Sequence, residues 1–201
     1  MLKRGTQLGF TIVELMVGIM VLAILLAMGG PGFATWMQNS QIRTMSDAVK
    51  DGLQLARAEA VRRNAQVRFE LMDSLGAGCA QATTGPNWIV SMDGAAGACN
   101  STNMADDAAP AAPRVIQSRP AGDGSRNATV AASQAAVVFN GLGRVTPAPA
   151  ADITINVTNP TGGSCAASAG PMRCLRIVVG ASGQIRMCDP RWSAATNSEG
   201  C

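Results

Sequence analysis

An apolar run from Phe10 to Met28, interrupted by a single carboxylate at Glu14, is the feature that most constrains the fold of this chain. As an α-helix the run is about 28 Å long, close to the thickness of the hydrocarbon core of a bilayer. A charged side chain in such a segment costs about 2.5–3.5 kcal/mol on insertion scales, so its presence requires a reason. One interpretation is an ordinary membrane anchor that carries a stray acid. The other is a signal that an enzyme cuts and an assembly then uses.

The residues before the apolar run distinguish these interpretations. An ordinary secretory signal has its small-residue cleavage site after the apolar stretch. Here the small residue, Gly9, precedes that stretch, and Lys3 and Arg4 supply a basic start. Cleavage at Gly9 would remove a short cationic leader and leave the apolar segment on the protein. The basic leader also predicts that this end stays in the cytoplasm while the rest is exported.

Gly9, Phe10 and Glu14 resemble, without a gap, the class III signal of type IV pilins and of the related pseudopilins of type II secretion. The resemblance implies that prepilin peptidase cuts between Gly9 and Phe10 and methylates the amino group of Phe10. It also implies that Glu14 pairs with the Phe10 amino group of a neighbouring subunit during assembly. A buried carboxylate is tolerable when a cation meets it, which agrees with this role.

The sequence is therefore expected to form four segments. Residues 1–9 are a prepilin leader peptide, and residues 10–32 are a transmembrane helix that later lies in the filament core. Residues 33–65 are the soluble half of the same helix, and residues 66–201 are a β-rich globular region outside the inner membrane.

A helix break is predicted at Pro31, within Gly29-Gly30-Pro31-Gly32. Proline removes a backbone donor and clashes with the preceding turn. Pilins commonly carry a helix-breaking proline at this distance from the cleavage site. A simple end to the membrane helix is the alternative.

The soluble half of the helix carries one apolar stripe at helical spacing. The stripe consists of Ile42, Met45, Val49, Leu53, Ala56 and Ala60. It is expected to pack against a sheet. Arg43 with Asp47, and Glu59 with Arg63, are predicted to form ion pairs on the outer surface, worth a few tenths of a kcal/mol each.

From Gln66 onward the apolar period changes to two, which is typical of half-buried strands. The predicted strands lie at residues 67–71, 88–92, 114–118, 137–140, 153–157, 175–179 and 185–188. Gly180-Ala181-Ser182-Gly183 predicts a hairpin turn, and residues 94–113 and 160–171 read as long surface loops. A long N-terminal helix packed on antiparallel β-sheet is an α+β plan, of type IV pilin-like form.

Three further stretches are similar to the GspH/FimT/FimU branch of minor pilins and pseudopilins. They are residues 54–60, 139–145 and 183–190. The resemblance implies low abundance in the filament, often within a tip complex that primes assembly. It also implies contacts with other minor and major pilins and with the inner-membrane assembly platform. The chain would be anchored in the bacterial inner membrane first, and would then lie in the periplasm or in the cell-surface pilus.

Six cysteines follow the helix, in the part expected to fold in the oxidising periplasm. They are Cys79, Cys99, Cys165, Cys174, Cys188 and Cys201. Six cysteines allow many pairings. Pairing of nearest neighbours gives 79 with 99, 165 with 174 and 188 with 201. A metal site is the rival interpretation, but the chain has no Cys-x-x-Cys and no histidine, so no zinc or other metal is expected.

Catalysis is not expected from this composition. Without histidine there is no Ser-His or Cys-His pair and no usual general base near neutral pH. No Gly-rich phosphate loop follows a strand, and no cofactor is predicted. The chain is instead expected to be the substrate of a peptidase.

Charge bears on a possible DNA partner. Removal of Lys3 and Arg4 lowers the formal charge from +3 to about +1, which makes no case for nucleic acid by itself. Arginines nevertheless gather in residues 111–201, where they could meet phosphates. Some FimT-type pilins bind DNA through a late Gly-Arg-x-Arg motif, and this chain has Gly183-Gln184-Ile185-Arg186, without the first arginine. Arg186 and Arg191 remain candidates, and Arg191-Trp192 is also a candidate contact to the next pilin.

The sequence thus predicts a minor type IV pilin that helps to initiate or cap pilus assembly, in support of adhesion, twitching motility or DNA uptake. A GspH-like minor pseudopilin of type II secretion is the first alternative. A DNA-binding minor pilin for natural transformation is the second.

Overall fold

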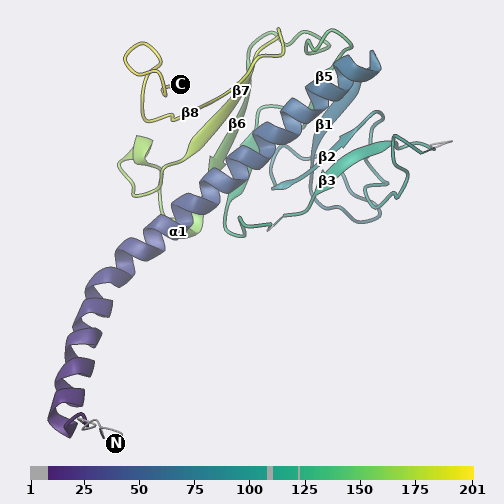
Figure 1. The fold of residues 1–201 in the computed structure, drawn as a ribbon. Coiled ribbons are helices and arrows are strands. Elements are labelled where there is room, and N and C mark those ends of the chain that lie inside the picture. The colour runs from purple at the N-terminus through teal and green to yellow at the C-terminus, as the bar shows by residue number, and fades with distance from the viewer. Residues whose placement is uncertain (1–8, 108–110, 122) are drawn as a thin grey trace, which may run out of the picture.

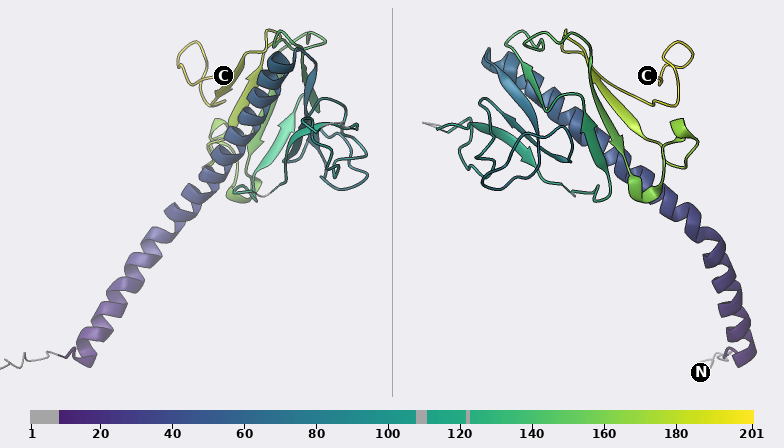
Figure 2. Two further views of the ribbon diagram at one scale, coloured as in Figure 1. Left: turned by 45° about the vertical axis from the view of Figure 1, so that its right-hand side comes forward. Right: turned by 180° about the vertical axis from the view of Figure 1, so that it is seen from behind.

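One long helix leads into a two-sheet domain (Figure 1). The computed structural model describes residues 9–107, 111–121 and 123–201, apart from the side chains of residues 27–31. Helix α1 spans Ile12–Arg63, and its N-terminal half projects away from the domain in a gentle curve, whereas its C-terminal half packs on the sheets (Figures 1 and 2). The helix ends at Asn64, whose φ of 47° places it in the left-handed region where a helix commonly stops.

The N-terminal half of α1 bears on two sequence predictions. Pro31 lies among the residues whose side chains fall outside the description, so the break predicted there stays a prediction, while the helix is assigned continuously through this position. A search of the described residues finds no helix with a stretch both long enough and apolar enough to cross a membrane.

In the part of the chain that the structure describes, eight strands form two antiparallel sheets of four strands each. The first sheet has the order β3-β2-β1-β5, with β3 at Val115–Arg119, β2 at Asn87–Ser91, β1 at Val67–Met72 and β5 at Ala136–Phe139. The second has the order β4-β6-β7-β8, with β4 at Thr129–Ala132, β6 at Ile153–Thr158, β7 at Leu175–Val179 and β8 at Ile185–Cys188. Two short 3-10 helices, η1 at Pro160–Gly162 and η2 at Ala166–Ser168, precede β7.

The predicted stripe of α1 is the helical side of the core. All six of its residues are at most 1% exposed, and they pack with inward side chains of both sheets. The rings of Phe69 and Trp88 lie 5.6 Å apart beneath the helix. A Cβ at Gly52 would come within 2.9 Å of Phe69, so this glycine allows the helix to approach the first sheet closely. The core prediction is confirmed, and the fold is the predicted α+β arrangement.

The strand predictions are confirmed to within about two residues at each end, with two corrections. Strand β4 was not predicted, because Thr129–Ala132 lacks the large alternating side chains on which strand prediction rests. Strand β1 is not half-buried as predicted: five of its six residues are buried. The loops that carry Cys79 and Cys99 cover its second face and form a small separate cluster there with Met72 and Ile89.

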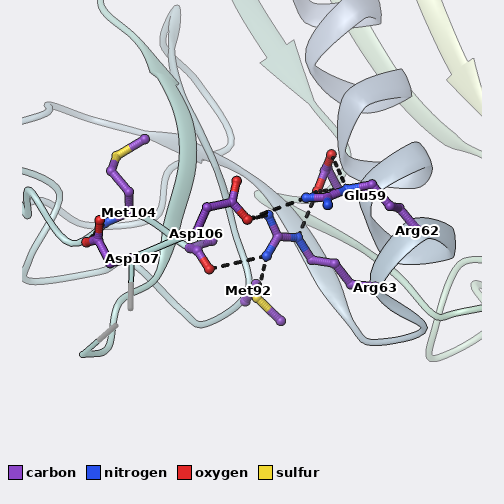
Figure 3. Close-up of polar contacts among 8 residues, drawn as sticks. Glu59, Arg62, Arg63, Met92, Met104, Asp106 and Asp107 are labelled. Atoms are coloured by element: carbon purple, nitrogen blue, oxygen red, sulfur yellow. Dashed lines mark hydrogen bonds and ion pairs between the residues drawn. The ribbon is translucent and has the colours of Figure 1, made fainter. Parts of the chain in front are cut away.

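The predicted ion pair between Glu59 and Arg63 forms, at 2.7 Å, but not on the outer surface. Both side chains are only about 15% exposed, because the connection between β2 and β3 lies over them (Figure 3). Arg63 also donates to the Ala105 carbonyl at 3.3 Å and to Asp106 at 2.6 Å. The pair that the sequence assigns to a solvated face therefore joins the helix to the first sheet. The other predicted pair, Arg43 with Asp47, is exposed, with a distance of 3.8 Å.

Candidate functional site

The start of α1 is built around Thr11. Its backbone is extended, with φ −79° and ψ 152°, and its Oγ1 accepts a hydrogen bond of 3.2 Å from the backbone N–H of Glu14. Thr11 is thus the N-cap, and Glu14 is the acidic residue of the first helical turn. A carboxylate at this position also interacts favourably with the helix dipole. The sequence prediction missed this role of Thr11, although threonine followed three residues later by glutamate is the usual sign of a capping box.

The Gly9–Phe10 peptide bond lies just outside the helix. Gly9 and Phe10 have no regular secondary structure, and Phe10 is 83% exposed. A Cβ built at Gly9 has no atom within 4 Å. The bond at which cleavage is predicted therefore lies outside the helix, and its cleavage stays a prediction. Residues 1–8 lie outside the described part of the chain, so the leader itself is not placed.

The N-terminal half of α1 is mostly apolar, and from Ile12 to Leu26 no described residue of the chain covers it. Its large hydrophobic side chains from Ile12 to Leu26 are between 51% and 76% exposed. An exposed apolar surface of this extent marks a site that another molecule or a membrane covers. Glu14 lies within this surface and is itself exposed. Its predicted partner, the amino group of another subunit, requires a second molecule and stays a prediction.

The six cysteines form three disulfides, paired as nearest neighbours in sequence. They are Cys79–Cys99, Cys165–Cys174 and Cys188–Cys201. The first joins two loops beside β1, the second closes the η2 loop, and the third closes the C-terminal loop onto β8. The described residues contain no cluster of acidic, cysteine or histidine side chains that could hold a metal ion.

The C-terminal loop presents the other predicted site residues. The Arg191 guanidinium lies 4.4 Å from the centre of the Trp192 ring and 3.7 Å from Asp189. Arg186, on β8, donates to the Gly200 carbonyl at 3.3 Å. Trp192 is 41% exposed. The loop therefore displays a stacked Arg-Trp pair, while part of the hydrogen-bonding capacity of both arginines is used within the chain.

A set of side-chain amides holds α1 where the helix leaves the domain, and we call it the amide collar. The collar consists of Gln38, Asn39 and Gln41 on the helix and of their loop partners Asn127, Asn159 and Arg173. The Arg173 backbone N–H donates to Asn39 Oδ1 at 2.7 Å, and the Asn127 N–H donates to Gln41 Oε1 at 3.1 Å. The sequence prediction missed the collar, because its members are far apart in the chain and follow no local pattern.

An open groove of about 610 Å³ lies beside the collar, between α1 and the C-terminal loop. Trp36 and Arg43 line it from the helix, and Met187, Asp189 and Glu199 line it from the other side. Its lining is mixed in charge. Trp36 also stacks against Phe33 on the helix, with ring centres 5.8 Å apart.

The comparisons with known proteins cover both parts of the chain. Residues 46–183 match the family described as type II transport protein GspH, and residues 4–30 match the prokaryotic N-terminal methylation motif. No curated protein matches the chain.

Two solved structures are similar to it, both of the type IV minor pilin FimU of Pseudomonas aeruginosa strain PAO1, in different crystal forms. The match to one is 13% identical in sequence, covers 72% of this chain and 90% of the FimU chain, and has a TM-score of 0.46. The other is 15% identical and covers 76% and 91%, with a TM-score of 0.48.

Proposed function

The chain belongs to the GspH family and carries an N-terminal methylation motif, and from this premise we propose that it is a minor type IV pilin that helps to initiate or cap pilus assembly. The family is structural rather than enzymatic, and its members are minor pilins or pseudopilins of type IV pili or of type II secretion. The motif implies processing by prepilin peptidase and assembly with other pilins.

The exposed apolar half of α1 is the observation that carries this proposal. A helix whose large side chains are all more than half exposed from Ile12 to Leu26 is unstable in water. We infer that lipid covers it before assembly, with the N-terminus in the cytoplasm, and that the helices of other pilins cover it in the filament. In the filament, the amino group of a processed Phe10 from a neighbouring subunit would supply the cation for Glu14.

The disulfides favour a pilus over a secretion pseudopilus. All three close loops of the globular domain, and Cys188–Cys201 closes the C-terminal loop. Exposed loop tips are where proteases cut, and closing them limits local opening. A subunit displayed outside the cell gains more from this protection than one retained in the periplasm. A GspH-like pseudopilin of type II secretion is the alternative.

Removal of the gene, followed by complementation, tests the proposal. Loss of surface pili with normal protein secretion is the expected result, and the native chain should restore the pili. A Gly9→Leu variant should accumulate uncut and restore nothing. Loss of secretion with normal pili would instead assign the chain to type II secretion, and normal cleavage of Gly9→Leu would contradict the processing site.

DNA uptake is a second possible role of the same pilus. The stacked pair of Arg191 and Trp192 supports it, because guanidinium groups bind phosphates and aromatic rings stack on bases. The ion pair of Arg191 with Asp189 weighs against it. A gel shift with the native protein over a range of salt concentrations tests it: salt-sensitive binding that Arg191→Gln weakens would support DNA uptake, and absent or salt-insensitive binding would exclude it.

A further inference from the structure

Several loops of the globular domain contact α1 just C-terminal to its apolar half, and we call them the rim. In this chain the rim comprises η1, η2 with the following residues to Arg173, and residues 123–127. Figures 1 and 2 show η1 beside the helix at the end of the domain that faces the N-terminus, with the η2 loop farther to the side. The amide collar fixes the height of these loops on the helix, because Arg173 bonds to Asn39 and Asn127 bonds to Gln41.

The height of the rim matches the thickness of a bilayer. A helix rises about 1.5 Å per residue, so Asn39 lies about 44 Å along the helix from Phe10. A bilayer is about 40–45 Å thick with its headgroups and about 30 Å thick in its hydrocarbon core. With Phe10 at the cytoplasmic interface, Phe33 and Trp36 reach the opposite interface, and the rim reaches the headgroups beyond it.

An exposed aromatic pair occupies that interface. Phe33 is 60% exposed and Trp36 is 65% exposed, and the two ring centres lie 5.8 Å apart. Tryptophan is enriched at membrane interfaces, because its ring is apolar while its N–H requires a polar partner.

Among the charged residues of the rim, the arginines lie closest to the apolar half of α1. Arg173 lies at the level of Asn39, Arg126 lies next to the level of Gln41, and Arg43 is on the helix itself. All three are exposed. Neither Arg126 nor Arg173 forms an ion pair with any described residue. Side chains on a helix tilt toward its N-terminus, so Arg43 leans toward the apolar half.

Four acidic side chains lie on the rim or near it and could offset the charge of these arginines. Asp47 lies one turn farther from the apolar half and pairs with Arg43. Asp123 precedes Gly124, which contacts the helix at Thr44. Glu199 lines the groove together with Trp36 and is exposed. Asp189 also lines the groove, but it is buried and paired with Arg191. The two aspartates at 47 and 123 therefore lie farther from the apolar half than Arg173 does, and the exposed Glu199 lies across the groove from Trp36.

We propose that, before assembly, this rim rests on the outer headgroup layer of the membrane, with Phe33 and Trp36 at the interface and Arg43, Arg126 and Arg173 on lipid phosphates. The proposal rests on the proposed function, because it requires that the apolar half of α1 spans the bilayer. The contact orients the domain on the membrane while the subunit waits for assembly, and it ends when the helix leaves the bilayer. Arginine suits this role because its planar guanidinium binds phosphate oxygens in pairs.

Amide hydrogen exchange of the full chain in vesicles tests the proposal. The chain is reconstituted in phosphatidylcholine and in phosphatidylcholine with about one third phosphatidylglycerol, where each arginine near the surface changes binding about fivefold. Exchange in residues 160–174 should slow about fivefold in the anionic vesicles. Arg173→Gln should abolish most of this slowing and Glu199→Gln should increase it, whereas Arg144→Gln, an exposed arginine on the loop after β5, should leave it unchanged.

Each other outcome has a stated meaning. Equal exchange in both vesicle types, or an equal effect of Arg144→Gln, would overturn the proposal. Slowing that appears only when a second pilin is added, regardless of lipid, would overturn it and assign the rim to a subunit contact. A chain that does not float with the vesicles at all would contradict the membrane anchor of the proposed function. A chain that floats without lipid-dependent exchange would contradict the rim contact alone.

Discussion

Arg63 in the last turn of α1 donates a hydrogen bond of 2.6 Å to Asp106 in the connection between β2 and β3 (Figure 3). The Arg63 side chain is 14% exposed and that of Asp106 is 75% exposed. The same guanidinium donates to Glu59 at 2.7 Å and to the Ala105 carbonyl at 3.3 Å. One mostly buried cation thus joins the end of the long helix to a loop 43 residues farther along the chain.

Replacement of Arg63 by methionine should therefore destabilise the domain. Met keeps the aliphatic length but leaves Glu59 and the Ala105 carbonyl without this donor, which should lower the free energy of unfolding by about 2 kcal/mol. Denaturant unfolding of residues 33–201 would measure it. Arg43→Met, at a 73% exposed side chain, is the matched control and should change stability by less than about 0.5 kcal/mol. Equal effects of the two variants would contradict the role of Arg63.

Stability should fall in acid because of paired carboxylates. The Arg114 guanidinium donates to Asp93 twice at 2.8 Å and holds the pKa of Asp93 below its ordinary value of 3.8. Arg62 and then Arg63 hold the pKa of Glu59 below 4.5. Each folded-state pKa is depressed, so this stabilisation is complete above the unfolded value and is lost as the pH falls through the folded value.

We expect the free energy of unfolding to begin to fall near pH 4.5 and to continue falling below pH 3.8, the ordinary values of the two groups. Asp93→Asn should show a shallower fall than the native chain over this range. Denaturant unfolding at a series of pH values would measure both slopes. Identical slopes in the two proteins would show that the pair of Asp93 with Arg114 does not contribute to the acid response.

Gly183→Ala should be strongly destabilising. Gly183 has φ +80° in the hairpin between β7 and β8, and an added Cβ would clash with the Gly143 carbonyl oxygen. Strain and clash together should cost about 3 kcal/mol, visible as a lowered melting temperature. Gly76→Ala, where a Cβ meets nothing within 4 Å, is the control and should be nearly neutral. A neutral Gly183→Ala would show that the two turns do not pack as described.

Loss of the Cys188–Cys201 disulfide should free the C-terminal loop without unfolding the domain. The bridge closes a separation of 13 residues, so the double variant Cys188→Ala/Cys201→Ala should lose at most about 3 kcal/mol. Limited proteolysis should then cut between residues 189 and 200. In Cys165→Ala/Cys174→Ala the same loop should resist cleavage. Resistance in both double variants would mean that other contacts hold the loop.

Glu14→Ala and Glu14→Gln should both be processed normally but enter filaments poorly. Each removes the carboxylate that would meet the amino group of a neighbouring Phe10, and loss of one partner of a buried pair costs about 3–5 kcal/mol. Immunoblots of sheared pili should show a reduction of more than tenfold. Asp152→Asn, at an exposed acid of the globular domain, is the control. Normal incorporation of Glu14→Gln would remove the proposed pairing.

Local periodicity determined much of this protein in advance. The apolar stripe from Ile42 to Ala60 repeats with the helical period, and the alternation in Ile153–Thr158 repeats with the strand period. In each element the period of the apolar residues therefore predicts which face is buried. Neighbouring cysteines that bracket short loops meet because a short chain segment holds its ends close. Gly9, Phe10 and Glu14 were recognisable by their resemblance to the pilin signal, because all three lie within a few residues of one another.

Only the tertiary structure decided what covers each surface. Glu70 alternates as a strand residue should, yet it is fully buried and accepts hydrogen bonds from Gln81 and from the Ala95 N–H, because distant loops fold over β1. Arg63 is mostly buried and the collar forms for the same reason. The period of a segment is a property of neighbouring residues, whereas the coverage of its outer face depends on contacts between residues far apart in the chain. Such contacts leave no repeat in the sequence, so burial of these polar groups appears only in the folded chain.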